Sequence, residues 1–123
     1  MAKHNDIGRW GEDLAAERLG ALGFTVLERN WRMGHLEIDI VARKDDVLVV
    51  AEVKTRSDGF VDPLEAVDRR KIMAMVRAAE AYTKSSNIAL DVRFDLFAVT
   101  GTPDDYVLEH VPDAFYPPLR TYR

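Results

Sequence analysis

Two neighbouring apolar segments constrain the fold more than any other part of this chain. Residues 36–43 and residues 47–54 are both rich in Val and Ile, and only the short polar segment 44–46 separates them. Segments of this composition form β-strands, and a connection this short allows only an antiparallel hairpin. We therefore predict that a two-stranded hairpin lies at the centre of the fold.

The register of this hairpin determines which side chains face one another. With a loop of two or four residues, Asp39 is predicted to lie across from Glu52, and Glu37 across from Lys54. Because strand side chains alternate between the two faces of a sheet, these four charged residues share one face. The opposite face, predicted to be core, carries Leu36, Ile38, Ile40, Ala42, Val49, Ala51 and Val53.

The charged face has two interpretations. In the first, it is a solvated surface on which Glu37 pairs with Lys54, which is the commoner situation in a hairpin. That interpretation does not explain Asp39 and Glu52, because two carboxylates on Cβ atoms about 5 Å apart destabilise a sheet. In the second interpretation, a divalent cation lies between Asp39 and Glu52.

Composition limits the chemistry available to this chain. Its 123 residues are 47% hydrophobic, which predicts one domain, residues 1–123, with a single core. Without Cys, thiol nucleophiles and thiolate zinc sites are excluded, and a metal would have oxygen ligands. We expect a cytoplasmic protein without a membrane partner, because no segment resembles a signal peptide or the roughly 20 apolar residues of a membrane span. The net charge of −4 argues against bulk electrostatic coating of nucleic acid, although a local basic patch remains compatible with it.

Two helices are predicted from apolar residues at spacings of three and four. The first covers residues 6–22, with Asp6 as its N-cap and Gly23 as its C-terminal stop. The second covers residues 62–84, where an Asp-Pro pair that begins at Asp62 is a typical helix start.

Three further strands are predicted outside the central hairpin. They cover residues 24–32, 91–99 and 106–111, the last as an edge strand. The expected order is thus α-β-β-β-α-β-β. Since the hairpin connections are too short for crossovers, this order predicts an α/β fold with a mixed sheet of about five strands flanked by helices.

Each predicted helix carries charged residues with two interpretations. Glu12 lies at the border of the apolar stripe of the first helix, where a carboxylate can reach around the rim of a sheet. An acid on a helix surface more commonly serves solubility. In the second helix, Arg69, Arg70 and Lys71 form the densest basic run of the chain. A solvated helix face and a contact with phosphate groups both account for this run.

Several motifs resemble those of a known family. Asp39 together with Glu52-Val53-Lys54 resembles the PD-(D/E)xK signature of the restriction-endonuclease-like superfamily. Other motifs look like those of the small bacterial YraN family, up to about residue 82: Gly8-Arg9, Gly11-Glu12, Arg29-Asn30-Trp31-Arg32, Glu37-Ile38-Asp39, Glu52-Val53-Lys54-Thr55-Arg56, Pro63, Glu65-Ala66-Val67 and Lys71. One departure is Leu36, which stands where many members carry Gly directly before the Glu-Ile-Asp motif.

The resemblance implies a metal-dependent nuclease with a restriction-endonuclease-like fold. Asp39, Glu52, Glu12 and the backbone carbonyl of Val53 would bind Mg²⁺ or Mn²⁺, and Lys54 would be the catalytic lysine. Oxygen ligands suit these ions, which assist phosphodiester hydrolysis by activating water. Arg56 and the basic run of Arg69, Arg70 and Lys71 are predicted to contact nucleic acid. The similarity of the family to archaeal Holliday-junction resolvases favours DNA as the partner and raises the expectation of a homodimer.

Two other functions are compatible with the sequence. A non-catalytic nucleic-acid-binding module could use the same groove and basic run, since a fold does not determine activity. A metal-independent hydrolase of sugars could use the paired carboxylates, but Lys54 would then have no role. A metal-dependent nuclease would lose its cleavage activity in excess chelator, whereas a metal-independent sugar hydrolase would keep its activity. A binding module would show no hydrolytic activity in either condition.

Overall fold

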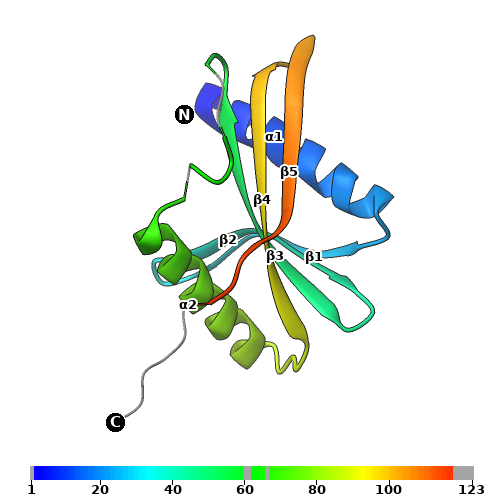
Figure 1. Cartoon of the computed structure of the whole chain (residues 1–123), viewed down its shortest axis with the longest axis vertical. Coiled ribbons are helices and arrows are strands. Elements are labelled where there is room, and N and C mark those ends of the chain that lie inside the picture. Colours follow the sequence, from blue (N-terminus) through cyan, green and yellow to red (C-terminus); the bar gives the residue numbers. More distant parts are fainter. Residues whose placement is uncertain (1, 60–61, 66, 118–123) are drawn as a thin grey trace.

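In the part of the chain that the structure describes, five strands form a mixed sheet with one helix against each face. The computed structural model describes residues 2–59, 62–65 and 67–117 (Figure 1). The elements in chain order are α1 (Ala2–Ala21), β1 (Thr25–Met33), β2 (Leu36–Lys44), β3 (Val47–Arg56), α2 (Arg69–Ser85), β4 (Asp91–Thr102) and β5 (Asp105–Phe115). The sheet order is β1-β2-β3-β4-β5, with β3 and β4 parallel and all other neighbours antiparallel. The predicted α/β class and the predicted order of elements are confirmed.

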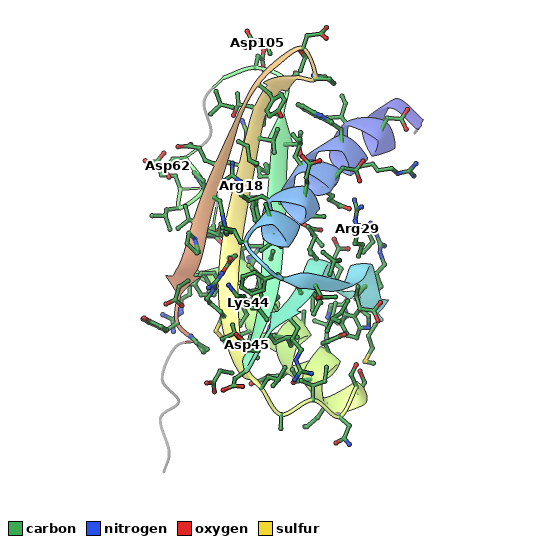
Figure 2. All side chains as sticks on the ribbon, turned by 90° about the vertical axis from the view of Figure 1, so that its right-hand side faces the viewer. Arg18, Arg29, Lys44, Asp45, Asp62 and Asp105 are labelled. Carbon is green, nitrogen blue, oxygen red and sulfur yellow. The ribbon has the colours of Figure 1, made fainter. Side chains whose placement is uncertain are left out.

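The central hairpin, β2 and β3, has the predicted register. Ile40 pairs with Ala51 and Lys44 pairs with Val47, so the connecting loop has two residues. The ladder between β2 and β3 ends at the Ile40–Ala51 pair, one step before Asp39 and Glu52. The two acids therefore lie where the strands begin to separate. Figure 2 shows the β2–β3 turn, at Asp45, and the β4–β5 turn at opposite ends of the molecule.

Both faces of the hairpin are core, which corrects the expectation of one apolar and one charged face. Ile40 and Val49 pack in a cluster with α1, whereas Val41 and Val50 pack in a cluster with α2. Because helices cover both sides of the sheet, residues of either parity along the strand are buried. The four charged residues of the predicted face lie beyond the last ladder pair or beside it, at the end of the hairpin away from the turn.

A local irregularity lies at Asp39. Asn30, the β1 residue opposite it, has a left-handed backbone with a φ of 54°, and the β1–β2 ladder skips this pair. Ile38 and Ile40 flank Asp39 but pack in the clusters on opposite faces of the sheet. The side chains of β2 therefore change faces at Asp39, and the prediction that Ile38 and Ile40 share one face is wrong.

Helix α1 begins at Ala2, so the prediction of Asp6 as its N-cap is wrong. Its predicted end is confirmed. Gly23 has a φ of 96°, its N–H donates to the carbonyl of Gly20, and the N–H of Phe24 donates to the carbonyl of Leu19. This pair of bonds is a Schellman motif, which requires a left-handed residue that glycine adopts at low cost. No described helix is long and apolar enough to cross a membrane.

Helix α2 begins at Arg69, later than predicted, and its N-cap is Asp68. The Asp68 carboxylate accepts a hydrogen bond from the backbone N–H of Lys71 at 2.9 Å. Asp62 accepts a hydrogen bond from the N–H of Leu64, but this bond closes only an isolated turn. Leu64 is 51% exposed, so a helix there would gain little apolar burial.

Strands β4 and β5 are both longer than predicted, and β5 is an edge strand as expected. Phe115, near the end of β5, stacks on Phe94 of β4 with ring centroids 4.9 Å apart. This contact extends the pairing well beyond the predicted limit at residue 111, because burial of two aromatic rings stabilises the added ladder.

Candidate metal centre

Asp39 is a half-buried carboxylate tied to the neighbouring strand. Its Oδ2 accepts a hydrogen bond from the N–H of Val53 at 2.8 Å. Burial, the charge of Glu52 and the charge of Glu12 raise its pKa to about 7, against the opposite effects of the Val53 N–H and Lys71. A carboxyl in this state can exchange its proton for another cation near neutral pH.

Glu12 approaches this site from α1. Gly11 is buried, and a Cβ at this position would collide with the side chain of Thr55, so only glycine allows α1 this close to β3. The Glu12 side chain is 14% exposed and accepts a hydrogen bond from Asn30 Nδ2 at 2.9 Å. Arg29, which Figure 2 shows beside α1, lies 3.7 Å from Glu12. Glu12 therefore reaches the rim of the sheet, where its charge acts on Asp39.

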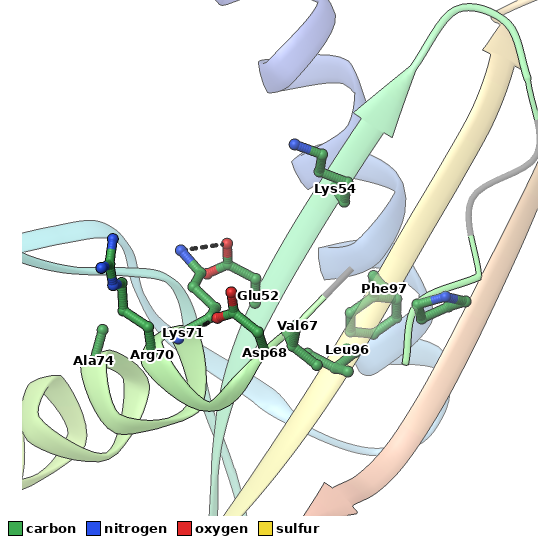
Figure 3. Close-up of a pocket in the computed structure, with 10 residues that line it drawn as sticks. Glu52, Lys54, Val67, Asp68, Arg70, Lys71, Ala74, Leu96 and Phe97 are labelled. Carbon is green, nitrogen blue, oxygen red and sulfur yellow. Dashed lines mark hydrogen bonds and ion pairs between the residues drawn. The ribbon is translucent and has the colours of Figure 1, made fainter. Parts of the chain in front are cut away.

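Glu52 is held by a lysine from α2. The Nζ of Lys71 lies 2.9 Å from the Oε2 of Glu52, and Figure 3 shows this ion pair at the start of the helix. Burial would lower the pKa of Lys71, but the hydrogen bond and charge of Glu52, with the charge of Asp39, raise it above its ordinary value. Lys71, predicted to contact nucleic acid, thus lies inside the acidic site.

Lys54 lies between two pockets. The first, with a volume of about 430 Å³, is lined by Glu52, Lys71 and the apolar residue Val67, among others. The second, of about 480 Å³, is lined by Glu12 and other residues, and Lys54 contributes to both. In Figure 3 the Lys54 side chain stands apart from the Glu52–Lys71 pair. This location leaves the ammonium accessible to a ligand in either pocket.

The expected pairing of Glu37 with Lys54 is wrong. Glu37 lies 3.7 Å from Arg32 of the adjacent strand β1 instead. Strand β1 supplies this partner because it pairs directly with β2, whereas the β2–β3 ladder has already ended at Ile40. The interpretation of this face as a solvated surface depended on a Glu37–Lys54 ion pair, and that pair is absent among the described residues.

The predicted nucleic-acid contacts are only partly gathered at the pockets. Arg70 and Lys71 line the first pocket, and Arg56 lines the second. Arg69 is exposed at the start of α2 and lines neither of them. Cationic side chains thus lie on both sides of Lys54.

The predicted metal donors lie near one another but are not assembled around one point. Among the residues that the structure describes, no three acidic or histidine side chains converge closely enough to hold a metal ion. Glu52 is engaged by Lys71, and Glu12 is engaged by Asn30. The donor set nevertheless fits Mg²⁺ or Mn²⁺ in its chemistry, because hard divalent ions prefer carboxylate and carbonyl oxygens. Holding an ion would require at least Glu52 to leave its present partner.

Asn30 was not among the predicted site residues. It contacts Glu12 and its left-handed backbone lies opposite Asp39. Asparagine is one of the few residues besides glycine that adopts positive φ readily, so an Asn inside a predicted strand is a signal that could have identified this position.

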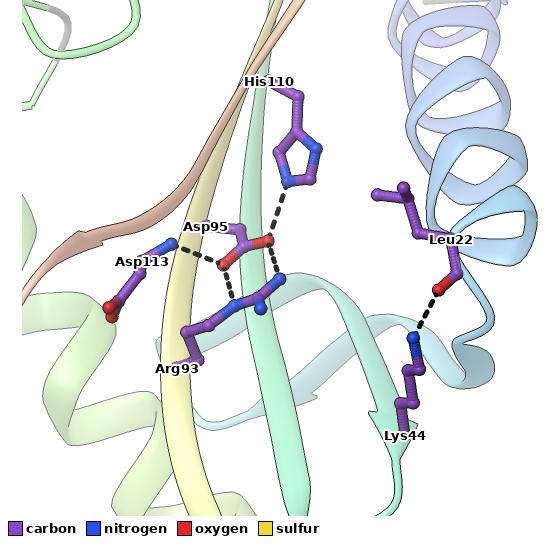
Figure 4. Close-up of polar contacts among 6 residues, drawn as sticks. All are labelled: Leu22, Lys44, Arg93, Asp95, His110 and Asp113. Carbon is purple, nitrogen blue, oxygen red and sulfur yellow. Dashed lines mark hydrogen bonds and ion pairs between the residues drawn. The ribbon is translucent and has the colours of Figure 1, made fainter.

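A second polar cluster, outside this candidate site, lies between β4 and β5 (Figure 4). Asp95 is fully buried and accepts hydrogen bonds from Arg93 at 2.8 and 2.9 Å, from His110 Nε2 at 2.7 Å and from the N–H of Asp113 at 3.0 Å. Burial would raise the pKa of Asp95, but these hydrogen bonds lower it below its ordinary value. The His110 ring stacks on Phe97. Since the Asp95 oxygens are already bonded, this cluster stabilises the sheet.

Comparisons with known proteins place the chain in a family. Residues 11–99 match the uncharacterised protein family UPF0102. A UPF0102 protein of Bacteroides thetaiotaomicron is 49% identical over 120 residues, which cover 97% of this chain and 99% of that protein. UPF0102 protein FP2501 of Flavobacterium psychrophilum is 44% identical over 117 residues, which cover 94% and 98%. The resemblance to the YraN family is thereby confirmed, and the chain belongs to the uncharacterised protein family UPF0102.

Proposed function

We propose that this protein is a metal-dependent nuclease that hydrolyses phosphodiester bonds in DNA or structured nucleic acid. The observation that carries the proposal is the environment of Asp39. Its half-buried carboxyl lies near Glu52 and Glu12, and its pKa is raised to about 7. Crowded acids of this kind destabilise a fold, and carboxyls with strongly shifted pKa values are concentrated at functional sites.

Each predicted residue of the site has a role in this proposal. Asp39, Glu52, Glu12 and the carbonyl of Val53 would hold Mg²⁺ or Mn²⁺. Bound there, the ion would lower the pKa of a water nucleophile and offset the charge of the scissile phosphate. Lys54, which lines both pockets, would orient that water and stabilise the negative charge that develops on the phosphate.

The remaining cations would bind the substrate backbone. Arg56 lines one pocket and Arg70 the other, so the two can contact phosphates on either side of Lys54. Phosphate contacts of this kind position a nucleic acid without reading its sequence. Such a substrate would therefore be selected by its shape.

Cleavage of labelled single-stranded, duplex, flapped and four-way-branched DNA in Mg²⁺ or Mn²⁺ tests the proposal. We expect Asp39→Asn and Lys54→Met each to lower the cleavage rate by at least about 10²-fold, because each removes a charge that acts on the transition state. Asp91→Asn and Lys84→Met change exposed residues of the same types, and both should retain the wild-type rate.

Circular dichroism would establish that all four variants are folded. Cleavage at the wild-type rate by folded Asp39→Asn would contradict the proposal. So would cleavage that persists in excess chelator, which is the result expected of a metal-independent hydrolase.

A nucleic-acid-binding module without activity is the second candidate. It is favoured by the ion pair between Lys71 and Glu52, which leaves the predicted metal donors unassembled. This function requires salt-dependent binding that Arg69→Ala and Arg70→Ala weaken, together with no cleavage in either metal. Cleavage by the wild-type protein would eliminate it.

A further inference from the structure

Lys71 contacts Glu52, one of the carboxylates proposed to bind the metal ion. Its ammonium lies 2.9 Å from Oε2 of Glu52, and its charge also acts on Asp39. A cation that contacts one acid and influences the next does part of the electrostatic work of a metal ion. The Lys71 ammonium and a divalent metal ion cannot both contact the same oxygen of Glu52 closely, because the two cations repel each other.

We propose that the Lys71 ammonium holds the place of a divalent cation in the metal-free protein and is exchanged for that cation on Glu52. This inference rests on the proposed metal-dependent function and adds a residue that sets metal affinity. The apparent affinity for metal is then reduced by the free energy of the Lys71–Glu52 pair, which must be broken for the ion to bind.

The backbone of Lys71 is held in place at the start of α2. The N–H of Lys71 donates to the carboxylate of Asp68, the N-cap of α2, so the residue is fixed in the first turn of the helix. From there its side chain spans the space between α2 and β3 to reach Glu52 (Figure 3). The neighbouring residues Arg69 and Arg70 are exposed, and neither forms an ion pair within the described part of the chain.

The exchange does not require unfolding, because both partners are open to solvent. The side chain of Lys71 is 41% exposed and that of Glu52 is 24% exposed. An ion can therefore reach Glu52 while Lys71 moves by side-chain rotation alone. The displaced ammonium would stay in the pocket of about 430 Å³, beside Lys54 and Arg70, where a substrate phosphate can contact it.

Isothermal titration of Mn²⁺ into the full-length protein tests the exchange without any measurement of activity. We expect Lys71→Gln to bind Mn²⁺ about 5-fold or more tightly than the wild type, since it removes the competing cation. Lys71→Arg keeps a cation that can pair with Glu52 and should resemble the wild type. Arg77→Gln removes an exposed charge further along α2 that lines neither pocket, and it should also resemble the wild type. Glu52→Gln should lose binding.

The outcomes separate this inference from the proposed function. Equal Mn²⁺ affinity of wild type and Lys71→Gln, or weaker binding by the variant, overturns the exchange and leaves the metal site in place if Glu52→Gln loses binding. If neither the wild type nor any variant binds Mn²⁺, both the exchange and the proposed metal-dependent function are overturned.

A second measurement uses the wild-type protein in case Lys71→Gln does not fold. The ammonium resonance of Lys71, followed by NMR during titration with Mg²⁺, should shift as the Glu52 contact is lost. A resonance unchanged at saturating Mg²⁺ would overturn the exchange.

Discussion

Asp39 keeps a proton in the folded protein that the unfolded chain would lose at much lower pH. Its pKa rises from the ordinary 3.8 to about 7, chiefly because of burial and the charge of Glu52. Between these values the folded state binds more protons than the unfolded state, so stability decreases as pH rises. The contribution of Asp39 is therefore fully present below about pH 4 and is lost as pH rises through about 7.

Replacing Asp39 with Asn should stabilise the protein at high pH. Asn keeps an oxygen that can accept the hydrogen bond of the Val53 N–H, but it has no charge to bury. We expect Asp39→Asn to raise the free energy of unfolding by about 1 to 2 kcal/mol at pH 8, and by much less at pH 5. Urea unfolding at the two pH values measures the difference.

The exposed substitution Asp91→Asn is the control for that experiment and should have little effect at either pH. A loss of stability in Asp39→Asn at pH 8 would mean that the charged carboxylate is stabilising, contrary to its raised pKa.

At the scale of elements, the contact between α1 and β3 determines whether Glu12 reaches the site. Gly11 lies against Thr55 so closely that no larger residue fits without movement of the helix. Glu12 is the next residue, so any displacement of α1 also displaces its carboxylate. The site therefore depends on a residue that itself has no chemical function.

Adding one methyl group at Gly11, where α1 contacts β3, should destabilise the protein. We expect Gly11→Ala to lower the free energy of unfolding by about 2 kcal/mol because of overpacking against Thr55. Gly8→Ala, on the same helix with open space around it, should be neutral or stabilising by up to about 1 kcal/mol. Thermal and urea unfolding measure both.

The double variant Gly11→Ala/Thr55→Ala removes the Oγ1 that the new methyl group would meet, so it should recover part of the loss. If Gly11→Ala is as stable as Gly8→Ala, the close packing of α1 on β3 is not present in solution.

At the scale of the whole molecule, a buried polar network holds the edge strand β5 onto the sheet. Asp95 of β4 binds His110 and the backbone of Asp113, both in β5, and also binds Arg93. Hydrogen bonds from these groups lower its pKa. A carboxylate of this kind contributes stability above its unfolded pKa of about 3.8, and that stability is lost as pH falls through its folded value.

Acid should therefore release β5 through Asp95. We expect wild-type stability to fall steeply below about pH 4, and Asp95→Asn to cost about 3 kcal/mol at pH 7 because it leaves Arg93 and His110 without their anion. The variant should also show a flatter decline in acid. Circular dichroism from pH 7 to pH 2 follows both, with Asp91→Asn on the same strand as control. A variant that declines as steeply as the wild type would assign the acid sensitivity to other groups.

The sequence alone determined the features that depend on neighbouring residues. Two apolar segments joined by a short polar loop were enough for the β2–β3 register, and Gly23 was enough for the end of α1. These are short-range effects, because strand periodicity and turn chemistry act over a few residues. The order of elements followed from the same patterns, and so did the proximity of Asp39 to Glu52.

Only the tertiary structure decided which of these residues are covered and which side chains meet. Because α1 and α2 lie on opposite faces of the sheet, both faces of the hairpin are buried, which no local pattern could show. The N-cap of α2 is Asp68, where local patterns predicted Asp62, because burial against the packed sheet decides where the helix is stabilised. The same packing brought Lys71 of α2 to Glu52 of β3, although the two residues are far apart in the sequence. Burial and long-range electrostatics depend on distances between elements, and those distances exist only once the chain has folded.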